Sequence, residues 1–542
     1  MGAAATHRQF DVIVVGAGHN GLTAAAYLAR AGRRVLVLER RAVVGGCAVT
    51  EEIDPLRAPG CRVSTASYIA SMLRPEVISD LRLGNYGLRM EPCEPGVQVA
   101  FEDGSVLAWW SDRGRLVREL EAVSPGDVAG FIALEQELKH LAGYLEPLFL
   151  QAPPDFAASG VARWRDWLQL WWRLRALRGR DLAPLTRFMT TSLAQLLESQ
   201  FAHPKLQRLV LANSLYGKHG GPWQPGTAMG LLFHLLSGGE RRQAGFQGHV
   251  MGGMGSITAA LASACRDLGV EIRCDSEVAS IDVHDHAVRG VTLQCGQSLA
   301  AGVVLSNADP KRTYLGLLDA RWFEPQFLNS VRAIRMAGPC GKVNYVLSAE
   351  PRVTGMPADR TPAERSLFTL VPTLADAEAG YHASQRGKIH DRLWIDCVLA
   401  SNVDSSLVTA DRHVMTCFVQ FLPWQPSDGD WPSRRDALGD QVTRQIENYA
   451  PGFSSTVVAR DVLTPFDLEQ RFGITEGNIF HGDIALDQLW HMRPVPQYSR
   501  YRGPLRGLYL CSAGGHPGGG VTGAPGYNAA RQLLRDGALG AA

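Results

Sequence analysis

The sequence contains no C-x-x-C pair, although ten cysteines are scattered over its 542 residues. Neither a dithiol redox centre nor a zinc knuckle is indicated, and we expect no metal site. No apolar run approaches the roughly 20 residues that a membrane-spanning helix needs. We expect the thiols to be reduced, and the first strand begins by residue 10, which leaves no room for a leader. Both expectations favour a cytoplasmic location.

An excess of charge of either sign is also missing, because 54 Lys and Arg residues stand against 53 Asp and Glu residues. The net charge of +1 offers no field for nucleic acid, so no nucleic-acid partner is expected. Neither G-x-S-x-G nor a paired-carboxylate arrangement is present, so a hydrolase is not indicated. A second complete G-x-G-x-x-G after a strand is missing too, and we expect no separate NAD(P)H-reading fold.

The most informative stretch is residues 10–46, where a strand, a glycine turn, a helix and a second strand follow one another. The apolar run Asp11–Val15 predicts a buried parallel strand. Small and apolar residues at helical spacing predict a helix over Leu22–Ala31, and Arg34–Leu38 predicts the second strand. This order is typical of the βαβ unit that binds a dinucleotide.

The turn G-A-G-H-N-G at 16–21 supplies what such a unit needs. Gly16 allows the tight turn, Gly18 lets backbone approach a pyrophosphate, and Gly21 lets helix and strand pack closely. The helix N-terminus offers N–H groups and a positive dipole end to the phosphates. Glu39, 18 residues after Gly21, is placed to accept the ribose hydroxyls. A structural glycine turn is the alternative interpretation, and spacing alone leaves both NAD and FAD open.

A second glycine pair, Gly45-Gly46, would let backbone approach the diphosphate again. With this pair, residues 10–46 resemble the opening of the FAD-dependent amine oxidase and phytoene desaturase superfamily. The stretches GNIFHGDIALDQLWHMRPVP at 477–496 and CSAGGHPGGGVTGAPGYNAA at 511–530 are similar to the C-terminal signature of phytoene desaturase-like proteins. Within that group the chain most resembles, over essentially its whole length, the branch called pyridine nucleotide-disulfide oxidoreductase domain-containing proteins.

The resemblance implies FAD as the cofactor and a fold of two parts. A Rossmann-type FAD-binding domain with a parallel sheet, of the α/β class, would be assembled from 8–75, 240–310 and 497–542. An α+β substrate domain would comprise 76–239 and 311–496. The expected FAD-binding residues are Gly16, Gly18, Asn20, Gly21, Glu39, Arg40, Gly45, Gly46, Val278, Gly515, Gly523, Gly526, Tyr527 and Asn528.

Three residues are candidates for catalysis. Lys342 resembles the lysine that amine oxidases place near flavin N5 through a water, whereas an exposed lysine at a strand edge is the other interpretation. His481 and His516 flank glycines in the C-terminal stretches and would act as acid or base near neutral pH. Each is equally interpreted as a structural histidine with satisfied hydrogen bonds.

Two short patterns invite a functional interpretation that the context does not favour. The run 252–255 looks like a second nucleotide loop, but it lacks a preceding strand, so we expect a helix entry there. The run 284–286 has metal-like spacing, yet it lies between alternating strands, where a solvated hairpin turn is the better interpretation.

A helical subregion over 112–216 contains an unusual segment at 161–180. This segment holds four of the twelve tryptophans and six arginines against one acid. On a helical wheel the tryptophans and leucines form a broad apolar arc, which suits a bilayer interface with anionic lipid. A helix packed on its own domain or on a second copy of the chain is the alternative.

The resemblance implies transfer of hydride between flavin and a hydrophobic, often polyene substrate, with electrons leaving to oxygen or a quinone. Oxidation of a C–N bond, as in flavin amine oxidases, remains open as a second activity. A third alternative is a flavin-fold protein with mainly a membrane- or partner-binding role.

Overall fold

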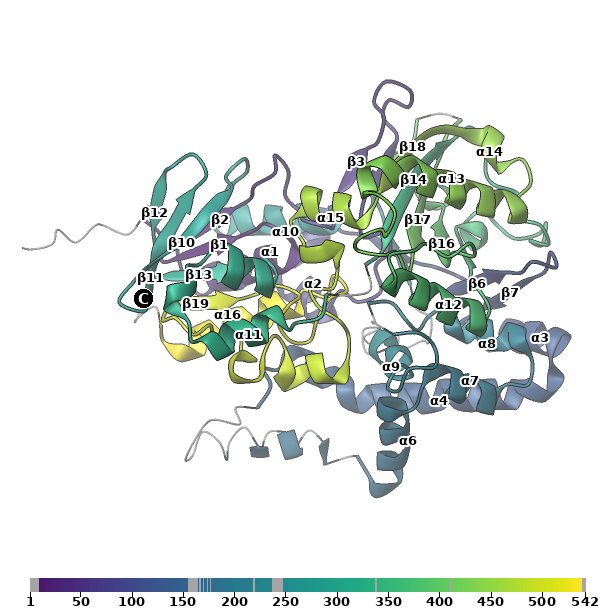
Figure 1. Cartoon of the computed structure of the whole chain (residues 1–542), viewed down its shortest axis with the longest axis horizontal. Helices are drawn as coiled ribbons and strands as arrows, with labels where there is room; N and C mark the ends of the chain where they lie inside the picture. Colours follow the sequence, from purple (N-terminus) through teal and green to yellow (C-terminus); the bar gives the residue numbers. More distant parts are fainter. Residues whose placement is uncertain are drawn as a thin grey trace, which may run out of the picture.

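A computed structural model describes residues 9–154, 177–217, 220–235, 247–336, 339–409 and 411–538, with some positions of 164–175. Two sheets organise the chain, one on the left of Figure 1 and one on the right, and a group of helices lies below the second sheet. The strands of the left-hand sheet are parallel and helices pack against it, which confirms the expected α/β class.

The parallel sheet has five strands in the order β19-β13-β1-β2-β9. Alternate residues of β1 enter different cores, because Val12 and Val14 pack with the helices while Ile13 and Val15 pack on the opposite face. A continuous apolar run is what a strand covered on both faces requires. The strands are β1 Val12–Val15, β2 Val35–Leu38, β9 Glu271–Arg273, β13 Val303–Ser306 and β19 Leu508–Leu510.

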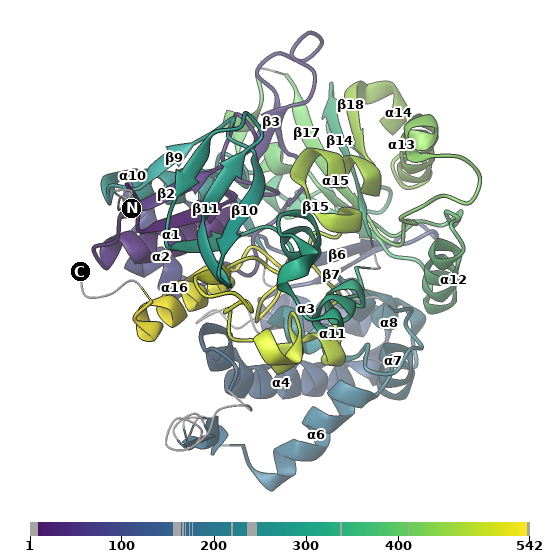
Figure 2. The same ribbon diagram turned by 60° about the vertical axis from the view of Figure 1, so that its left-hand side comes forward.

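Helices cover one face of this sheet and a small antiparallel sheet covers the other, as Figure 2 shows for β10 and β11. The turn between β10 and β11 contains Asp285 and His286, so the expected hairpin at 284–286 is confirmed. The helices are α1 His19–Arg30, α10 Gly255–Asp267 and α16 Ala524–Asp536. The opposite layer consists of β10 Val278–His284, β11 Ala287–Leu293, β12 Ser298–Ala300 and α11 Pro325–Arg332.

The second sheet has seven strands in the order β18-β14-β17-β16-β15-β6-β7, and only β15 and β6 pair in parallel. Helix α13 (Trp431–Tyr449) covers one face, where Val343, Tyr345 and Cys417 are buried. The strands are β6 Val97–Ala100, β7 Val106–Trp109, β14 Gly341–Leu347, β15 Leu367–Leu370, β16 Ile395–Val398, β17 His413–Val419 and β18 Val457–Leu463.

The opposite face of this sheet carries polar residues that are buried against the loop after β4. Asn344 Nδ2 donates to Thr65 O at 3.2 Å, and Thr416 Oγ1 donates to Asn344 Oδ1 at 2.6 Å. These bonds attach the sheet to a loop that comes from the N-terminal part of the chain. Two small sheets complete the strands, β3 Thr50–Glu52 with β4 Arg62–Ser64, and β5 Met90–Pro92 with β8 Gly248–Val250.

The helical group below the second sheet shares one core with β6 and β7. In the part of the chain that the structure describes, no helix combines the length and apolarity that crossing a bilayer demands. The helices of this group are α3 Arg113–Val123, α4 Val128–Leu145, α6 Gly179–Thr190, α7 Leu193–Gln200, α8 Pro204–Leu211 and α9 Met229–Leu235. The remaining helices are α2 Pro75–Asp80, α12 Leu374–Gln385, α14 Phe453–Thr456 and α15 Pro465–Phe472.

Much of the tryptophan-rich segment 161–180 lies outside the described residues. Of its described positions, Trp164 is 76% exposed and Trp171 is 63% exposed. Arg175 lies over the ring of Trp172, with 4.4 Å between the guanidinium carbon and the ring centroid. Contact of this segment with a membrane, with its own domain or with a second copy of the chain stays a prediction.

One helix boundary differs from expectation at the glycine-rich turns. Helix α1 begins at His19 and not at Leu22, because Gly18 is already its N-cap and the turn leads directly into the helix. The run 252–255 is a helix entry as expected, since α10 begins at Gly255. A strand, β8, does precede it, contrary to expectation, but β8 pairs with β5 and with Ala70 and stands outside the parallel sheet.

Candidate functional site

The site begins at the N-terminus of α1. Gly16 N donates to Leu38 O at 2.7 Å, and Gly16 adopts φ +97°, which favours glycine. No side chain caps the helix, and its first turn holds no acidic residue. The first amides of a helix have no intrahelical acceptor, so this end can receive an anion such as a diphosphate.

Two glycine turns meet at this point. A Cβ on Gly21 would lie 2.2 Å from Gly16 O, so only glycine lets the helix pack this close. Gly18 forms a parallel bridge with Gly45, and Gly45 N donates to Ala17 O at 2.9 Å. A Cβ on Gly46 would lie 3.4 Å from Gly18 Cα. Backbone from both turns therefore borders the same space.

Glu39 follows β2, and the backbone holds its carboxylate in place. Oε2 accepts from Ala17 N at 2.9 Å and Oε1 accepts from Arg41 N at 3.0 Å. The residue is buried, yet it borders the cavity described next. A carboxylate oxygen has room for more than one donor, so Glu39 can accept from ribose hydroxyls as well.

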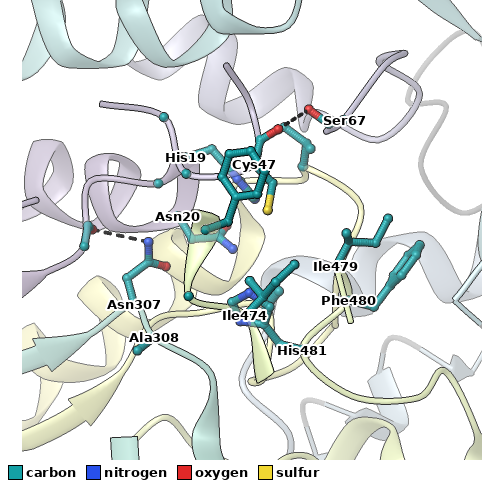
Figure 3. Close-up of a pocket in the computed structure, with 18 of the residues that line it drawn as sticks. His19, Asn20, Cys47, Ser67, Asn307, Ala308, Ile474, Ile479, Phe480 and His481 are labelled. Carbon is teal, nitrogen blue, oxygen red and sulfur yellow. Dashed lines mark hydrogen bonds between the residues drawn. The ribbon is translucent and has the colours of Figure 1, made fainter. Parts of the chain in front are cut away.

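A cavity borders these turns and also Phe418 of the second sheet, and Figure 3 shows part of its lining. Asn307 supports its floor, because Asn307 Nδ2 donates to Gly16 O at 3.3 Å. Of the residues predicted to bind FAD or act in catalysis, those that border the cavity are Gly16, Gly18, Asn20, Glu39, Arg40, Gly45, Gly46, Val278 and His481. Those that do not are Gly21, Lys342, Gly515, His516, Gly523, Gly526, Tyr527 and Asn528.

The nucleotide end of the cavity is positively charged. Burial lowers the pKa of Arg40, and the nearby charge of Arg312 adds to this effect. Glu277 lies 4.0 Å from the Arg40 guanidinium and 3.9 Å from that of Arg312. Val278 is the next residue, and it borders the cavity beside this group.

The other end is an aromatic chamber. Its wall includes Tyr68, Tyr216, Phe418 and Phe480. The rings of Tyr68 and Phe418 are stacked, with centroids 5.2 Å apart and planes inclined by 22°. Ile479 and Phe480 lie side by side in the wall in Figure 3. Such a surface suits an apolar substrate.

The carboxy-terminal residues predicted to meet the flavin mainly pack α16 against other elements. A Cβ on Gly526 would lie 2.1 Å from Asn20 O, so α16 crosses α1 in direct backbone contact. Tyr527 packs edge-on against Tyr27, with 4.9 Å between ring centroids. Asn528 Nδ2 donates to Phe149 O at 2.8 Å. From this part of the chain the cavity wall takes Ala513, Gly520 and Val521.

Three histidines at or behind the cavity wall differ in their surroundings, and of these His516 is buried. Burial lowers the pKa of His19 to about 3, and burial also lowers the pKa of His481. Both border the cavity, and His19 Nε2 and His481 Nδ1 have no hydrogen-bond partner. His516 lies behind the wall, where its Nε2 contacts Leu148 O at 2.9 Å and burial lowers its pKa to about 4. His516 thus has a hydrogen-bond partner for Nε2 but none for Nδ1, so its interpretation as a structural histidine with satisfied hydrogen bonds holds for one of its two ring nitrogens.

Lys342 is 1% exposed, so its interpretation as an exposed edge lysine is wrong. Strand β14 lies inside the sheet, so β17 and β18 cover its two edges, and the loop that carries Tyr68 covers the face on which Lys342 lies. Burial lowers the pKa of Lys342 to about 7. Its Nζ has no hydrogen-bond partner and lies 4.3 Å from the centroid of the Tyr68 ring.

Sequence reasoning missed Arg493, which joins the two C-terminal stretches. The guanidinium is buried and donates to the carbonyls of Phe480 (2.6 Å) and Ala513 (2.9 Å). It also donates to Asp483 O and Gln488 O, both at 3.1 Å. This arginine fixes the loop that carries His481. Arg493 lies within the HMRPVP stretch, but the neighbouring residues do not indicate which carbonyl groups it binds.

The residues of the cavity fit a dinucleotide cofactor. The uncapped helix end, the two glycine turns and the fixed carboxylate are the parts that diphosphate and ribose require. Three of the buried atoms without a hydrogen-bond partner in the described part of the chain, His19 Nε2, Asn20 Oδ1 and His481 Nδ1, belong to residues that border this space. Among the described residues, no cluster of three or more His, Cys, Asp or Glu side chains could hold a metal.

Solved structures share this fold. An oxidoreductase from Methanosarcina mazei superposes with a TM-score of 0.60 at 14% identity, covering 97% of this chain and 99% of its own. Putrescine oxidase with bound putrescine superposes with a TM-score of 0.57 at 16% identity, covering 97% and 98%. Residues 14–79 match a family model described as an NAD(P)-binding Rossmann-like domain. These matches define the class of fold, an α/β protein with a Rossmann-like nucleotide-binding domain.

Known sequences narrow this class. Pyridine nucleotide-disulfide oxidoreductase domain-containing protein 2 of Rattus norvegicus is 36% identical over 97% of this chain and 94% of its own. A limonene dehydrogenase polypeptide of Castellaniella defragrans is 25% identical, over 98% and 95%. The lycopene-forming phytoene desaturase of Pantoea ananas is 24% identical, over 94% and 96%. The chain belongs to the pyridine nucleotide-disulfide oxidoreductase domain-containing protein family, as its resemblance implied.

Despite the family's name, no disulfide joins any of the cysteines. All ten cysteines are free thiols. Cys397 and Cys417 are the pair with a close contact, with 3.6 Å between their sulfur atoms, and both are buried in the second sheet away from the cavity wall. Burial raises the pKa of the cavity thiol Cys47 to about 12, which makes it a poor nucleophile.

Proposed function

We propose that the protein is an FAD-dependent oxidoreductase that transfers hydride between flavin and a hydrophobic, polyene- or isoprenoid-like substrate, acting on C–C and C=C bonds. The observation that carries this proposal is the single cavity, which joins a dinucleotide-binding turn to an aromatic chamber. Two relatives are named for reactions of isoprenoid hydrocarbons, the limonene dehydrogenase polypeptide and the lycopene-forming phytoene desaturase.

FAD would supply a reversible acceptor for the two electrons of a hydride. The backbone at Gly16, Gly18 and Gly45, with the N-terminus of α1, would hold the diphosphate. Glu39 would accept from the ribose hydroxyls and Val278 would meet the adenine.

The charge of the cavity favours an apolar substrate over an amine. Among the described residues that border the cavity, the carboxylates are Glu39 and Glu277, and both lie at the nucleotide end. An ammonium substrate in the aromatic chamber would have no carboxylate partner there. Oxidation of a C–N bond is nonetheless the second candidate, because the stacked rings of Tyr68 and Phe418 offer π faces to a cation.

We infer that electrons leave to oxygen or a quinone, since the described residues contain one glycine turn of the dinucleotide type at the parallel sheet. We further infer that 8–75, 240–310 and 497–542 bind FAD while 76–239 and 311–496 build the substrate site. A cytoplasmic location, with peripheral membrane contact or self-association through 161–180, completes the proposal.

Anaerobic photoreduction of the purified holoprotein tests the proposal. We expect a bound flavin that is reduced by light and promptly reoxidised by oxygen or quinone. A panel of carotenoid precursors, retinoids and amines is then mixed with the oxidised holoprotein. We expect the isoprenoid compounds to reduce the flavin and the amines not to reduce it. Reduction by amines alone would favour C–N oxidation, whereas an inert or absent flavin would favour a binding role.

A further inference from the structure

Three side chains form a row across neighbouring strands of the second sheet. Phe418 on β17 pairs in register with Lys342 on β14 and with Asp396 on β16. Residues in register on adjacent strands point to the same face, and strands lie about 4.8 Å apart. Lys342 and Asp396 therefore stand on either side of Phe418 on the polar face of the sheet.

Tyr68 lies across this row and joins its two ends. Its ring stacks on Phe418, and its hydroxyl donates to Asp396 Oδ2 at 2.8 Å. The Nζ of Lys342 lies 4.3 Å from the centroid of the same ring. Tyr68 borders the cavity, whereas Lys342 and Asp396 do not. A phenol thus separates a buried carboxyl and a buried amine from the substrate space.

Burial brings the titration of these two groups near neutral pH. It raises the pKa of Asp396 to about 6, against the hydrogen bond from Tyr68 and the charge of Lys342. It lowers the pKa of Lys342 to about 7. Burial also raises the pKa of Tyr68, with Asp396 adding to the effect, so the phenol stays protonated. The other titratable groups that interact with the pair are Tyr216 and Cys340, together with Cys397 and Cys417 on the opposite face of the sheet.

We propose that Tyr68 is a catalytic proton-transfer residue of this oxidoreductase, with Asp396 as the buried holder of its proton and Lys342 as the positioning countercharge. The proposal rests on the function put forward above. It moves the expected catalytic role from the Lys342 amine, which the Tyr68 ring covers, to the hydroxyl that the cavity reaches.

The proton and electron balance of the step is simple. A bound flavin would supply the two-electron oxidant, so that one C–H bond of the substrate would break and its electron pair would leave as hydride. The cationic carbon left behind makes the neighbouring C–H acidic. That carbon loses a proton to the Tyr68 oxygen, its electron pair forms the C=C bond, and the Tyr68 proton moves to the Asp396 carboxylate. Asp396 ends protonated, and during reoxidation its proton would leave through the Tyr68 hydroxyl to the quinone that takes the hydride equivalent.

The variants that test the relay are Tyr68→Phe, Asp396→Asn and Lys342→Met, each close in size to the native residue. Tyr345→Phe is the matched control, because Tyr345 is a buried tyrosine of β14 on the other face of the sheet, bonded to Thr443 at 2.9 Å. All variants are first compared for flavin absorbance, which reports cofactor binding alone.

The first measurement is an infrared titration of the holoprotein labelled with ¹³C-aspartate. We expect one buried carboxyl that titrates near pH 6 and disappears in Asp396→Asn. Its pKa should rise in Tyr68→Phe, which removes a donor to the carboxylate, and in Lys342→Met, which removes the positive charge. Tyr345→Phe should leave it unchanged. The absence of such a carboxyl would overturn the proposal.

The second measurement is reoxidation of photoreduced holoprotein by menadione, a lipophilic quinone that takes a hydride equivalent and a proton. We expect Tyr68→Phe and Asp396→Asn to slow this step about a hundredfold, the usual loss for a proton-transfer group. Both should also lose the pH dependence near 6 to 7 and the solvent deuterium effect, while Tyr345→Phe keeps them. Equal rates in wild type and Tyr68→Phe would contradict the relay alone, whereas a colourless protein would contradict the proposed function itself.

Discussion

At the scale of single residues, two buried side chains differ in their hydrogen-bond partners. Two backbone N–H groups hold the carboxylate of Glu39 in place, at 2.9 and 3.0 Å. Lys342 has no such partner, and burial lowers its pKa to about 7. The first arrangement positions an acceptor, and the second leaves an amine that can lose its proton at neutral pH.

Glu39→Gln should weaken FAD binding by about 10- to 100-fold, because a hydrogen bond to a charged group contributes about 1.5–3 kcal/mol. The glutamine amide has only one oxygen, so its NH₂ group would face one of the two backbone N–H groups and that hydrogen bond would be lost. Titration of the apoprotein with FAD, followed by flavin fluorescence, measures the loss. The control is Glu271→Gln on β9, whose carboxylate pairs with Arg273 and does not border the cavity. Equal affinity for Glu39→Gln and wild type would remove the ribose role.

Lys342→Met should be more stable than wild type, by a margin that depends on pH. Lysine ordinarily titrates at 10.5, so between pH 7 and 10.5 the unfolded chain holds a proton that the folded chain lacks. Wild-type stability therefore rises with pH in this window, and the buried charge costs most at and below pH 7. Chemical denaturation across pH 6–10 should show the margin of Lys342→Met shrinking as pH rises. A margin that is constant or grows with pH would contradict a buried neutral amine.

At the scale of elements, the crossing of α1 and α16 holds the nucleotide-binding turn in place. Gly526 brings α16 against the backbone of α1 at Asn20, within the first turn whose amides face the cavity. The glycine segment before α16 contributes Gly520 and Val521 to the cavity wall. The two ends of the chain thus meet at one wall of the site.

Gly526→Ala should destabilise the fold by about 1–3 kcal/mol, the usual cost of overpacking, and weaken FAD binding with it. Its Cβ would lie 2.1 Å from Asn20 O, so one helix has to move. Thermal unfolding with and without FAD measures both effects. Gly179→Ala in α6 is the control, because a Cβ there meets no atom within 4 Å. Equal melting temperatures for Gly526→Ala and Gly179→Ala would disprove the close crossing.

At the scale of the whole molecule, local patterns explain which parts were predictable. The βαβ unit is local, because the turn at 16–21, the two strands beside it and Glu39 are close in sequence. Their spacing alone therefore predicts how they are arranged. Val278 depended on the resemblance, and the cavity does reach it. The hairpin at 284–286 and the helix entry at 252–255 were also local, and the structure confirms them.

Residues brought together by long-range pairing could not be predicted. Tyr68, Lys342 and Asp396 come from three distant stretches, and only the order β14-β17-β16 aligns the last two. Lys342 looked like an edge residue because the sequence does not reveal that β18 covers the outer side of its strand. The prediction that Gly526 meets the flavin came from the resemblance, whereas its close contact with Asn20 O depends on a helix crossing that no local pattern reveals.

The most direct test of the central claim is the stoichiometry of FAD on the freshly purified chain. The account predicts a yellow protein that carries one FAD per chain and, once stripped, takes up FAD in preference to NAD. A colourless protein that refuses FAD on reconstitution, or that binds NAD instead, would contradict it.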